Sequence, residues 1–543
     1  MAVLLTRQGK VGAARSLYRD IANANDYYHL AIGKTSDWID EEAPVPPVDA
    51  IHAVNEFRRD MIFTTLISSA DVCHLVRRID WVGDTVYDVY DDSYGRPYTE
   101  VFGTVGETPT YQAFSGATNL GDANFYVLTD EFKVYKCLDN NNGGLSTIKP
   151  EFTSTYTSTL ADLYKWKFMF QVSTSDQTKF LDSLYLPVRK FTASPYGDVN
   201  GEIDSIVITD GGSGYNTATA TVLGDGVGAS ASVTISGGII TDITIDSVGF
   251  GYSFAFIQIT GDGVDAAAYA AVGDVDSLPA LQASIESTAV RGTVDRISVV
   301  SVGQDYIDSD VTVIITGDGT GAEATATISS TLGQVIDITI TNAGSGYTYA
   351  NVSFSQLLAP GTGAAARAIV SPVSGHGAHP INELMANRVG VAISLSEIDN
   401  TDLFFNNDFR QVALVKNIYP YVNPTGPYLT RTGTACYIID VNDGTKYNID
   451  DSISSSDGGE FTVIQKTDDG SGTFQIHLQP SIRLLTDTNT LVNNTTGDTG
   501  LVINSRIEPE IDYTSGEIVY FENRANISRQ PSQVETIKAI FTF

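Results

Sequence analysis

The stretch DGGSGYNTATATVLGDGVGASASVTISGG, at residues 210–238, decides how the middle of this chain folds. Similar text returns as SVGFGYSFAFIQITGDGVDAAAYAAV at residues 247–272 and as NAGSGYTYANVSFSQLLAPGTGAAARAIVSP at residues 342–372. Strand-like alternation such as IDSIVIT precedes each copy and places every second side chain on one face. Glycines supply the positive φ angles that tight turns between strands need. Recurrence at this spacing is typical of tandem β modules.

The repeats lie between sections of a different texture. Residues 1–199, 374–426 and 508–543 mix helical and strand patterns, whereas residues 200–373 and 427–507 hold short strands between polar turns. In the first section VGAARSLYRDIANA and DAIHAVNEFRRDMIF have helical periodicity, and FYVLTDEFKVYKCLD and YKWKFMFQV are strand-like. We expect a mainly β fold with a few helices (α+β). Its multi-layer β-sandwich core is discontinuous in sequence, with small β modules inserted at 200–373 and 427–507.

Composition narrows the function classes. The formal charge of −33, from 32 basic and 65 acidic residues, argues against binding to nucleic acid or to an anionic membrane. No run approaches the roughly 20 apolar residues of a membrane helix. Cys73, Cys137 and Cys436 are far apart and odd in number, which favours buried thiols in a reducing cytosol over disulfides. We therefore expect a soluble protein that is not exported.

The motifs that carry catalytic or metal chemistry are weak. The sequence contains no GxSxG elbow, HExxH motif or Walker loop. His376 and His379, in GHGAHP, have a spacing that suits a metal. However, no Cys or Glu with ligand spacing accompanies them, which favours a turn or interface role. The GDG turns raise calcium as an alternative, although each offers only one aspartate. We expect no cofactor and no enzymatic activity.

Several segments of the outer sections resemble, in order, a baseplate wedge protein of T-even-like contractile-tailed phages. They are YYHLAIGKTSDWIDE, PPVDAIHAVNEFRRDMIF, LVRRIDWVGDTVYDVYDD, FKVYKCLD, YKWKFMFQV, DFRQVALV and the closing SGEIVYFENRANIS with ETIKAIFTF. The resemblance covers residues 26–199, 374–421 and 508–543, about half of the chain. It implies a non-enzymatic, β-rich subunit of the virion tail baseplate, assembled in the host cytoplasm. Such a subunit forms a homodimer and binds other wedge proteins.

The most specific pieces of the resemblance supply candidate interface or core anchors. In the first section they are Arg77, Arg78, Trp81 and Tyr87, with core packing the favoured role of Trp81. Arg524 lies in the tail motif, where it is either paired with a carboxylate or an ordinary strand-edge charge.

Given this resemblance, we interpret the repeat section at residues 200–373 as an accessory that contacts a neighbouring wedge, tail-fibre or peripheral baseplate protein. A rival function is a carbohydrate- or receptor-binding module of the tail periphery, in which Tyr215, Tyr252 and Tyr347 stack on sugars. Burial of these tyrosines would remove the best feature of that alternative. An enzyme that degrades host glycans would need two carboxylates within about 10 Å across an open groove.

Overall fold

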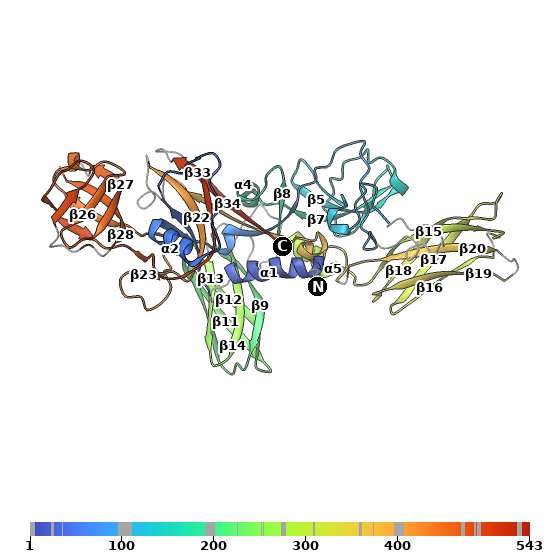
Figure 1. Ribbon diagram of the computed structural model, residues 1–543. Helices are drawn as coiled ribbons and strands as arrows, with labels where there is room; N and C mark the ends of the chain where they lie inside the picture. The colour runs from blue at the N-terminus through green and yellow to red at the C-terminus, as the bar shows by residue number, and fades with distance from the viewer. Residues whose placement is uncertain are drawn as a thin grey trace.

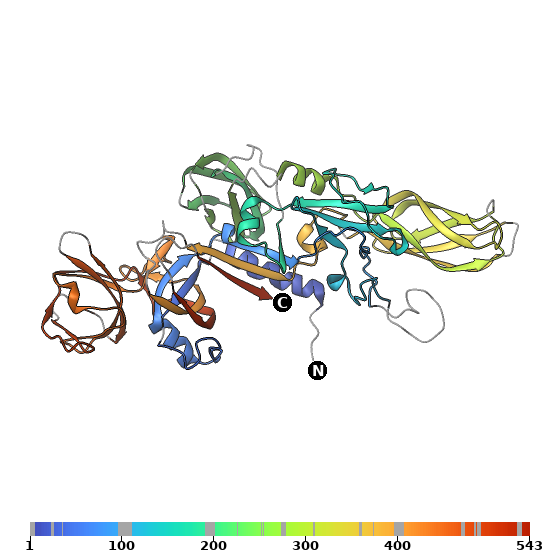
Figure 2. The same ribbon diagram turned by 90° about the horizontal axis from the view of Figure 1, so that it is seen from above.

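The computed structural model describes residues 6–22, 26–34, 36–95, 111–189, 201–224, 226–250, 252, 255–272, 279–307, 310–357, 361–372, 374–395, 407–468, 473–482, 485, 490–528 and 535–543. The protein is mainly β with a few helices, which confirms the expected fold class. It is elongated: β26–β28 lie at one end, β15–β20 at the other, and β9–β14 project from the middle (Figures 1 and 2). Within these ranges no helix is long and apolar enough to cross a membrane.

Two sheets form the core sandwich. The first has the order β24 (Thr432–Thr434), β2 (Met61–Leu66), β1 (Tyr28–Gly33), β22 (Asp408–Lys416) and β33 (Glu517–Ser528). The second has the order β34 (Glu535–Thr542), β21 (Arg388–Leu395), β3 (Val72–Arg77) and β8 (Tyr185–Val188). Side chains of both sheets share one buried cluster, in which Leu30 and Val412 lie with Val391. The core is therefore built from segments that are far apart in the sequence.

The two helices expected in the first section are present. Helix α1 (Arg7–Ala22) packs Ala14, Ile21 and Ala22 into the core cluster. Helix α2 (Ile51–Asp60) buries Phe57, whose ring lies 5.9 Å from that of Phe521 in β33. Beyond Asp60 the β-branched and aromatic sequence MIFTTL continues as strand β2, because such side chains fit a buried sheet. The short helices α4 (Thr174–Lys179), α5 (Pro279–Thr288) and α6 (Pro380–Glu383) connect the larger elements.

A second layer lies beside the sandwich. Its sheet has the order β4 (Tyr126–Leu128), β5 (Lys133–Asn140), β7 (Tyr164–Gln171) and β6 (Ser158–Thr159), and β4, β5 and β7 are the strands that the sequence indicates. Among the short 3₁₀ turns, η2 (Leu120–Asp122) and η3 (Asn141–Gly143) flank β4 and β5, whereas η1 (Ser69–Asp71) precedes β3 of the sandwich. The Trp166 side chain is fully buried in this sheet, and its ring stacks on Tyr164 at 5.6 Å.

Residues 201–372 form two separate modules of the same topology. Module 1 contains β9 (Ile203–Ser213), β10 (Ala218–Gly224), β11 (Val227–Ser236), β12 (Ile239–Phe250), β13 (Ala255–Gly261) and β14 (Val264–Val272). Module 2 contains β15 (Val294–Gln304), β16 (Thr312–Gly317), β17 (Thr320–Ile328), β18 (Val335–Ser345), β19 (Ala350–Ser355) and β20 (Thr362–Val370). Helix α5 lies in the chain between them.

Each module is built from two sequence repeats that pair in nested order. The first strand pairs with the last, the second with the fifth and the third with the fourth: β9 with β14, β10 with β13 and β11 with β12, then β15 with β20, β16 with β19 and β17 with β18. The longest ladders of every strand therefore join it to the other repeat. The folding unit is a pair of repeats: the three quoted copies and a fourth, degenerate copy around Tyr306 make up the two modules.

The turn tyrosines are structural. Tyr215, Tyr252, Tyr306 and Tyr347 expose only 5–7% of their surface. The Tyr347 ring occupies the space beside Gly319, where an added Cβ would lie 2.4 Å from Cγ of the ring. Gly344 has φ +63° and an added Cβ there would lie 2.5 Å from the amide nitrogen of Ala322, so only glycine fits. The buried tyrosine rings thus leave room only for glycine at the turn positions beside them.

The second inserted domain, at residues 437–507, is a separate seven-stranded sheet. Its order is β30 (Leu501–Val502), β29 (Thr490–Asn493), β26 (Ser452–Ser455), β27 (Glu460–Asp468), β28 (Phe474–Ile482), β25 (Tyr437–Val441) and β31 (Ser505–Ile507), with η5 (Gly444–Lys446) after β25. Two segments connect this domain to the core, and they pair with each other through β23 (Tyr419–Pro420) and β32 (Ile511–Asp512).

Tyr347→Ala should open module 2 locally. Removing a buried aromatic side chain costs about 3–5 kcal/mol, so amide exchange within residues 294–370 should accelerate on the order of a hundredfold or more. Hydrogen exchange followed by mass spectrometry measures this module by module. Tyr349→Ala is the matched control, because Tyr349 is 56% exposed and two residues away. Equal effects of both substitutions would contradict the structural role of Tyr347.

Candidate assembly interface

Module 2 is fixed to the core through a buried carboxylate. Asp91 is fully buried and forms an ion pair with Arg367 of β20, whose Nη1 lies 3.1 Å from Asp91 Oδ1. Arg296 of β15 lies 3.7 Å from the same side chain, and Tyr111 donates a hydrogen bond to it at 3.1 Å. Two cations of the module thus converge on one carboxylate of the core, which defines how the module docks.

A second buried network supports the same junction. Lys136 of β5 is fully buried and pairs with Glu383 of α6, which is 2% exposed in its side chain. Glu383 also accepts hydrogen bonds from the amides of Gly377 at 2.9 Å and His379 at 3.0 Å. Burial opposes ionisation of Glu383, but the Lys136 ammonium, His376 and the Gly377 amide together outweigh it and lower the pKa of the carboxyl group. The pair therefore fixes the loop before α6 as an ion pair.

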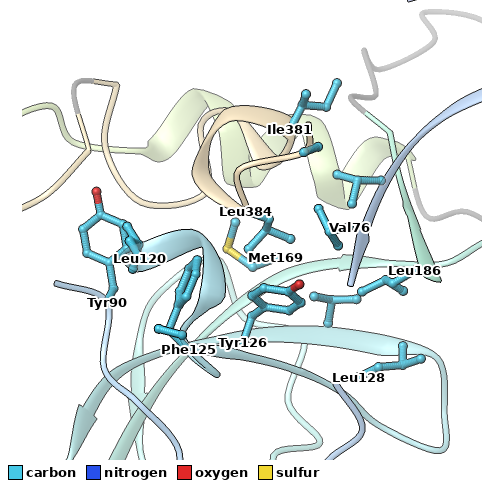
Figure 3. Close-up of a cluster of buried hydrophobic side chains, with 14 of the residues drawn as sticks. Val76, Tyr90, Leu120, Phe125, Tyr126, Leu128, Met169, Leu186, Ile381 and Leu384 are labelled. Carbon is cyan, nitrogen blue, oxygen red and sulfur yellow. The ribbon is translucent and has the colours of Figure 1, made fainter. Parts of the chain in front are cut away.

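The loop before α6 lies over a large apolar cluster. Ile381 and Leu384 of the α6 region belong to this cluster with Phe125 and Met169, and Figure 3 shows Leu384 close to Met169. Tyr90 belongs to this cluster, and its ring lies 5.3 Å from that of His376. The apolar contacts below and the ion pair with Lys136 hold α6 from two sides.

The histidine pair is used inside the protein. His376 Nε2 contacts Asp295 of module 2, and burial lowers the pKa of the imidazole. His379 caps α6, with Nδ1 accepting from the Asn382 amide at 3.4 Å. Across the parts of the chain that the structure describes, no group of three or more His, Cys, Asp or Glu side chains could hold a metal ion. The sequence expectation of a turn or interface role fits these contacts better than a metal site.

The aspartates of the GDG turns hold neighbouring loops. Asp262 accepts hydrogen bonds from the amides of Asn216 at 2.9 Å and Thr217 at 2.8 Å. Asp318 accepts from the amide of Thr348 at 2.8 Å in the same way. In both modules this carboxylate holds the facing turn of the other repeat. Asp225, in the first GDG turn, lies outside the described residues.

Module 1 is docked by different chemistry. Phe256 packs edge-on against Tyr27 at 5.7 Å, and Leu66 and Leu223 join the same cluster. Tyr269 meets Tyr18 of α1 at 6.1 Å. These contacts are mostly apolar, in contrast to the charged junction of module 2.

The four candidate anchors of the first section contact neighbouring segments of the chain. Arg77 donates to the carbonyl of Asp122 at 2.9 Å, and Arg78 donates to the carboxylate of Asp80 at 2.8 Å. The half-buried Trp81 donates to Ser146 Oγ at 3.2 Å. Tyr87 is buried, with its ring edge-on to Trp166 at 5.8 Å. Their observed role is to hold the loop that leaves β3.

Arg524 lies apart from these residues, on β33. Its Nε is 3.6 Å from Glu522, and both side chains are about 40% exposed, so the pair contributes little stability. Its backbone carbonyl accepts a hydrogen bond from the Trp38 indole at 2.8 Å. Of the two roles expected for Arg524, the carboxylate pairing is present, but it lies on the surface.

An exposed apolar strip runs beside β33, and sequence reasoning did not single it out. It comprises Ile39, Val45, Val48 and Ile51, with relative exposures of 109%, 75%, 56% and 81%. Asn523 of β33 donates to the Val45 carbonyl at 2.9 Å, which holds the strip against this edge strand. Val519 and Tyr520 of β33 are exposed as well. A sequence signal existed in the three prolines of APVPPVD, which favour an extended surface segment.

The three cysteines are buried and free, as the sequence predicts. Burial raises the pKa of Cys73 and of Cys436 to about 12, so neither thiol is a nucleophile near neutral pH. No model of a known protein family matches the chain, and a search of the curated proteins finds no significant match.

Arg367→Met should loosen module 2 from the core. The substitution removes the main partner of the buried Asp91 carboxylate, which costs about 3–5 kcal/mol. Amide exchange in residues 85–95 should therefore accelerate by at least a hundredfold. Lys149→Met is the control, because Lys149 pairs with an Asp130 side chain that is 76% exposed, and such pairs contribute about 0–1 kcal/mol. Unchanged exchange in residues 85–95 of Arg367→Met would contradict the junction.

Module 2 should lose stability in acid partly through Asp318. Hydrogen bonds from the side chain and amide of Thr348 lower the pKa of Asp318 from 3.8 to about 2. Because the folded pKa is the lower one, this stabilisation is complete above the unfolded pKa and is lost as the pH falls toward 2. In calorimetry, the decrease in Tm between about pH 5 and about pH 2.5 should be smaller in Asp318→Asn. Asp337→Asn, at an exposed position on β18, should behave as the wild type.

Proposed function

We propose that the protein is a structural subunit of a phage tail baseplate wedge, which forms a homodimer and binds neighbouring wedge subunits during tail assembly. The resemblance of residues 26–199, 374–421 and 508–543 supports this proposal. On this proposal the protein is located in the virion tail baseplate. The two modules and the domain at residues 437–507 are additions that project from the core.

The observation that carries the proposal is the apolar strip beside β33. The strip and β33 both belong to segments that carry the resemblance, although they lie at opposite ends of the sequence. Large apolar side chains that are exposed along one segment mark a contact with another protein. Strand β33 is the edge strand of its sheet, and an edge strand is where a second chain can add by backbone pairing.

The rival carbohydrate-binding function is weakened by the turn tyrosines. A side chain that stacks on a sugar must present its ring to solvent, whereas these four are at most 7% exposed. Their rings instead fill the space over the turn glycines. The tyrosines therefore give no support to a sugar-binding role for the modules.

Light scattering of the purified chain tests the proposal. The wild type should have twice the chain mass of 58.2 kDa and should form a larger complex with the other wedge subunits. Substituting Val45 and Val48 by Asp should weaken the dimer by at least about a hundredfold, because two charges enter a desolvated contact. Val227→Asp is the matched control, since Val227 on module 1 is also 56% exposed.

Two outcomes would count against the proposal. A wild-type chain that stays monomeric and ignores the wedge subunits would refute the assembly role itself. A dimer that is equally stable in the strip variant and in Val227→Asp would keep the assembly role but move the interface away from the strip.

A further inference from the structure

A groove of about 420 Å³ lies between α1, the loop around α6 and the base of module 2. Its volume falls in the range of protein sites that hold small ligands or short peptide segments. The groove is separate from the apolar strip beside β33, since the two share no lining residue. Its walls belong to the same junction that the buried ion pairs hold in place, so its shape is fixed by the fold.

One face of α1 forms the first wall. Gln8, Gly12 and Arg15 lie at helical spacing and line the groove together. At Gly12 an added Cβ would meet no atom within 4 Å, so the helix leaves open space there. A glycine inside a helix costs about 1 kcal/mol relative to alanine, and no close contact in the described chain requires it.

Two guanidinium groups face the groove without a carboxylate partner. Arg15 donates to the amide oxygen of Asn382 at 3.4 Å, and Arg291 lines the wall on the side of module 2. Within the described ranges neither side chain forms an ion pair. Burial, with the nearby Arg19 charge, lowers the pKa of Arg15, as expected for a cation whose charge is not compensated.

Cations are scarce in the part of the chain that contains the modules. Residues 201–370 contain fifteen Asp and three Glu but only three cations, Arg291, Arg296 and Arg367. Arg296 and Arg367 are both engaged by Asp91. The third, Arg291, is the one that turns toward the groove.

The rest of the lining defines the ligand further. Val11, Val370 and Met385 are apolar, and Tyr90 adds an aromatic surface. The carboxylate of Glu383 pairs with Lys136, and Asp92 also lines the wall. A bound segment therefore needs carboxylates for the arginines and apolar side chains for the floor.

We propose that this groove binds an acidic peptide segment of a partner protein, with its carboxylates on Arg15 and Arg291 and an apolar side chain against Val11 and Met385. Arginine and carboxylate groups form charge-assisted, often bidentate hydrogen bonds, which gives the site its selectivity for acidic over neutral segments. This binding does not depend on the dimer or on the wedge assembly.

Fluorescence anisotropy of the full chain with a labelled Leu-Glu-Leu-Glu amide peptide tests the proposal. We expect saturable binding that weakens about tenfold or more in Arg15→Gln and in Arg291→Gln, the value of one charge-assisted hydrogen bond. The Leu-Gln-Leu-Gln peptide should bind at least tenfold more weakly. Gly12→Trp should fill the open space and abolish binding, whereas Gly12→Ala, which only favours the helix, should leave it unchanged.

Each contrary result overturns the proposal. No saturable binding up to millimolar peptide would refute it, as would equal affinity for the Glu and Gln peptides. Unchanged binding in both Gly12→Trp and Arg291→Gln would place the peptide elsewhere on the chain. Glutarate that competes as tightly as the peptide would show that the groove serves a small dicarboxylate rather than a protein segment.

Discussion

The core sandwich depends on strand pairing between segments from the two ends and the middle of the chain. Strand β22 lies between β1 and β33, and β21 lies between β3 and β34. Neither sheet is complete until the last residues have been added. Every intervening domain must therefore leave the sandwich and return to it at nearby points, which compact β modules with adjacent ends can do.

The two modules share a topology but attach to the core in different ways. Module 1 docks through aromatic and aliphatic contacts, whereas module 2 docks through Asp91, Arg367 and Arg296. An apolar contact tolerates small rotations, because dispersion and desolvation have little directionality. A buried carboxylate shared by two guanidinium groups allows few geometries and is costly if one partner leaves. Module 2 is thus the more strictly oriented of the two modules, although it extends further from the centre of the molecule than module 1 does (Figure 1).

Local pattern was enough to predict much of the fold from the sequence. The periodicity of α1 and α2 and the aromatic-rich, strand-like sequences of β5 and β7 identify these elements, and the repeated glycine and tyrosine phrase identifies β modules. The pairing of repeats two by two could not be predicted, because each repeat contains the same strand pattern and nothing local states which copy completes it. The glycine positions report turns, but the nested ladders form between strands of different repeats.

The junction residues were missed for a related reason. Asp91, Lys136 and Glu383 are ordinary charged residues in the sequence, and only burial of all three gives them a role. The sequence offered one signal. Residues 201–370 contain eighteen acidic residues but only three arginines, which makes these arginines candidates for specific contacts. All three lie at the base of module 2, where it meets the core. Module 2 can be buried against the core because its arginines meet Asp91, whereas module 1 is buried through apolar side chains that carry no charge. Where neither arginines nor apolar side chains lie at the surface, the acidic modules repel other acidic surfaces.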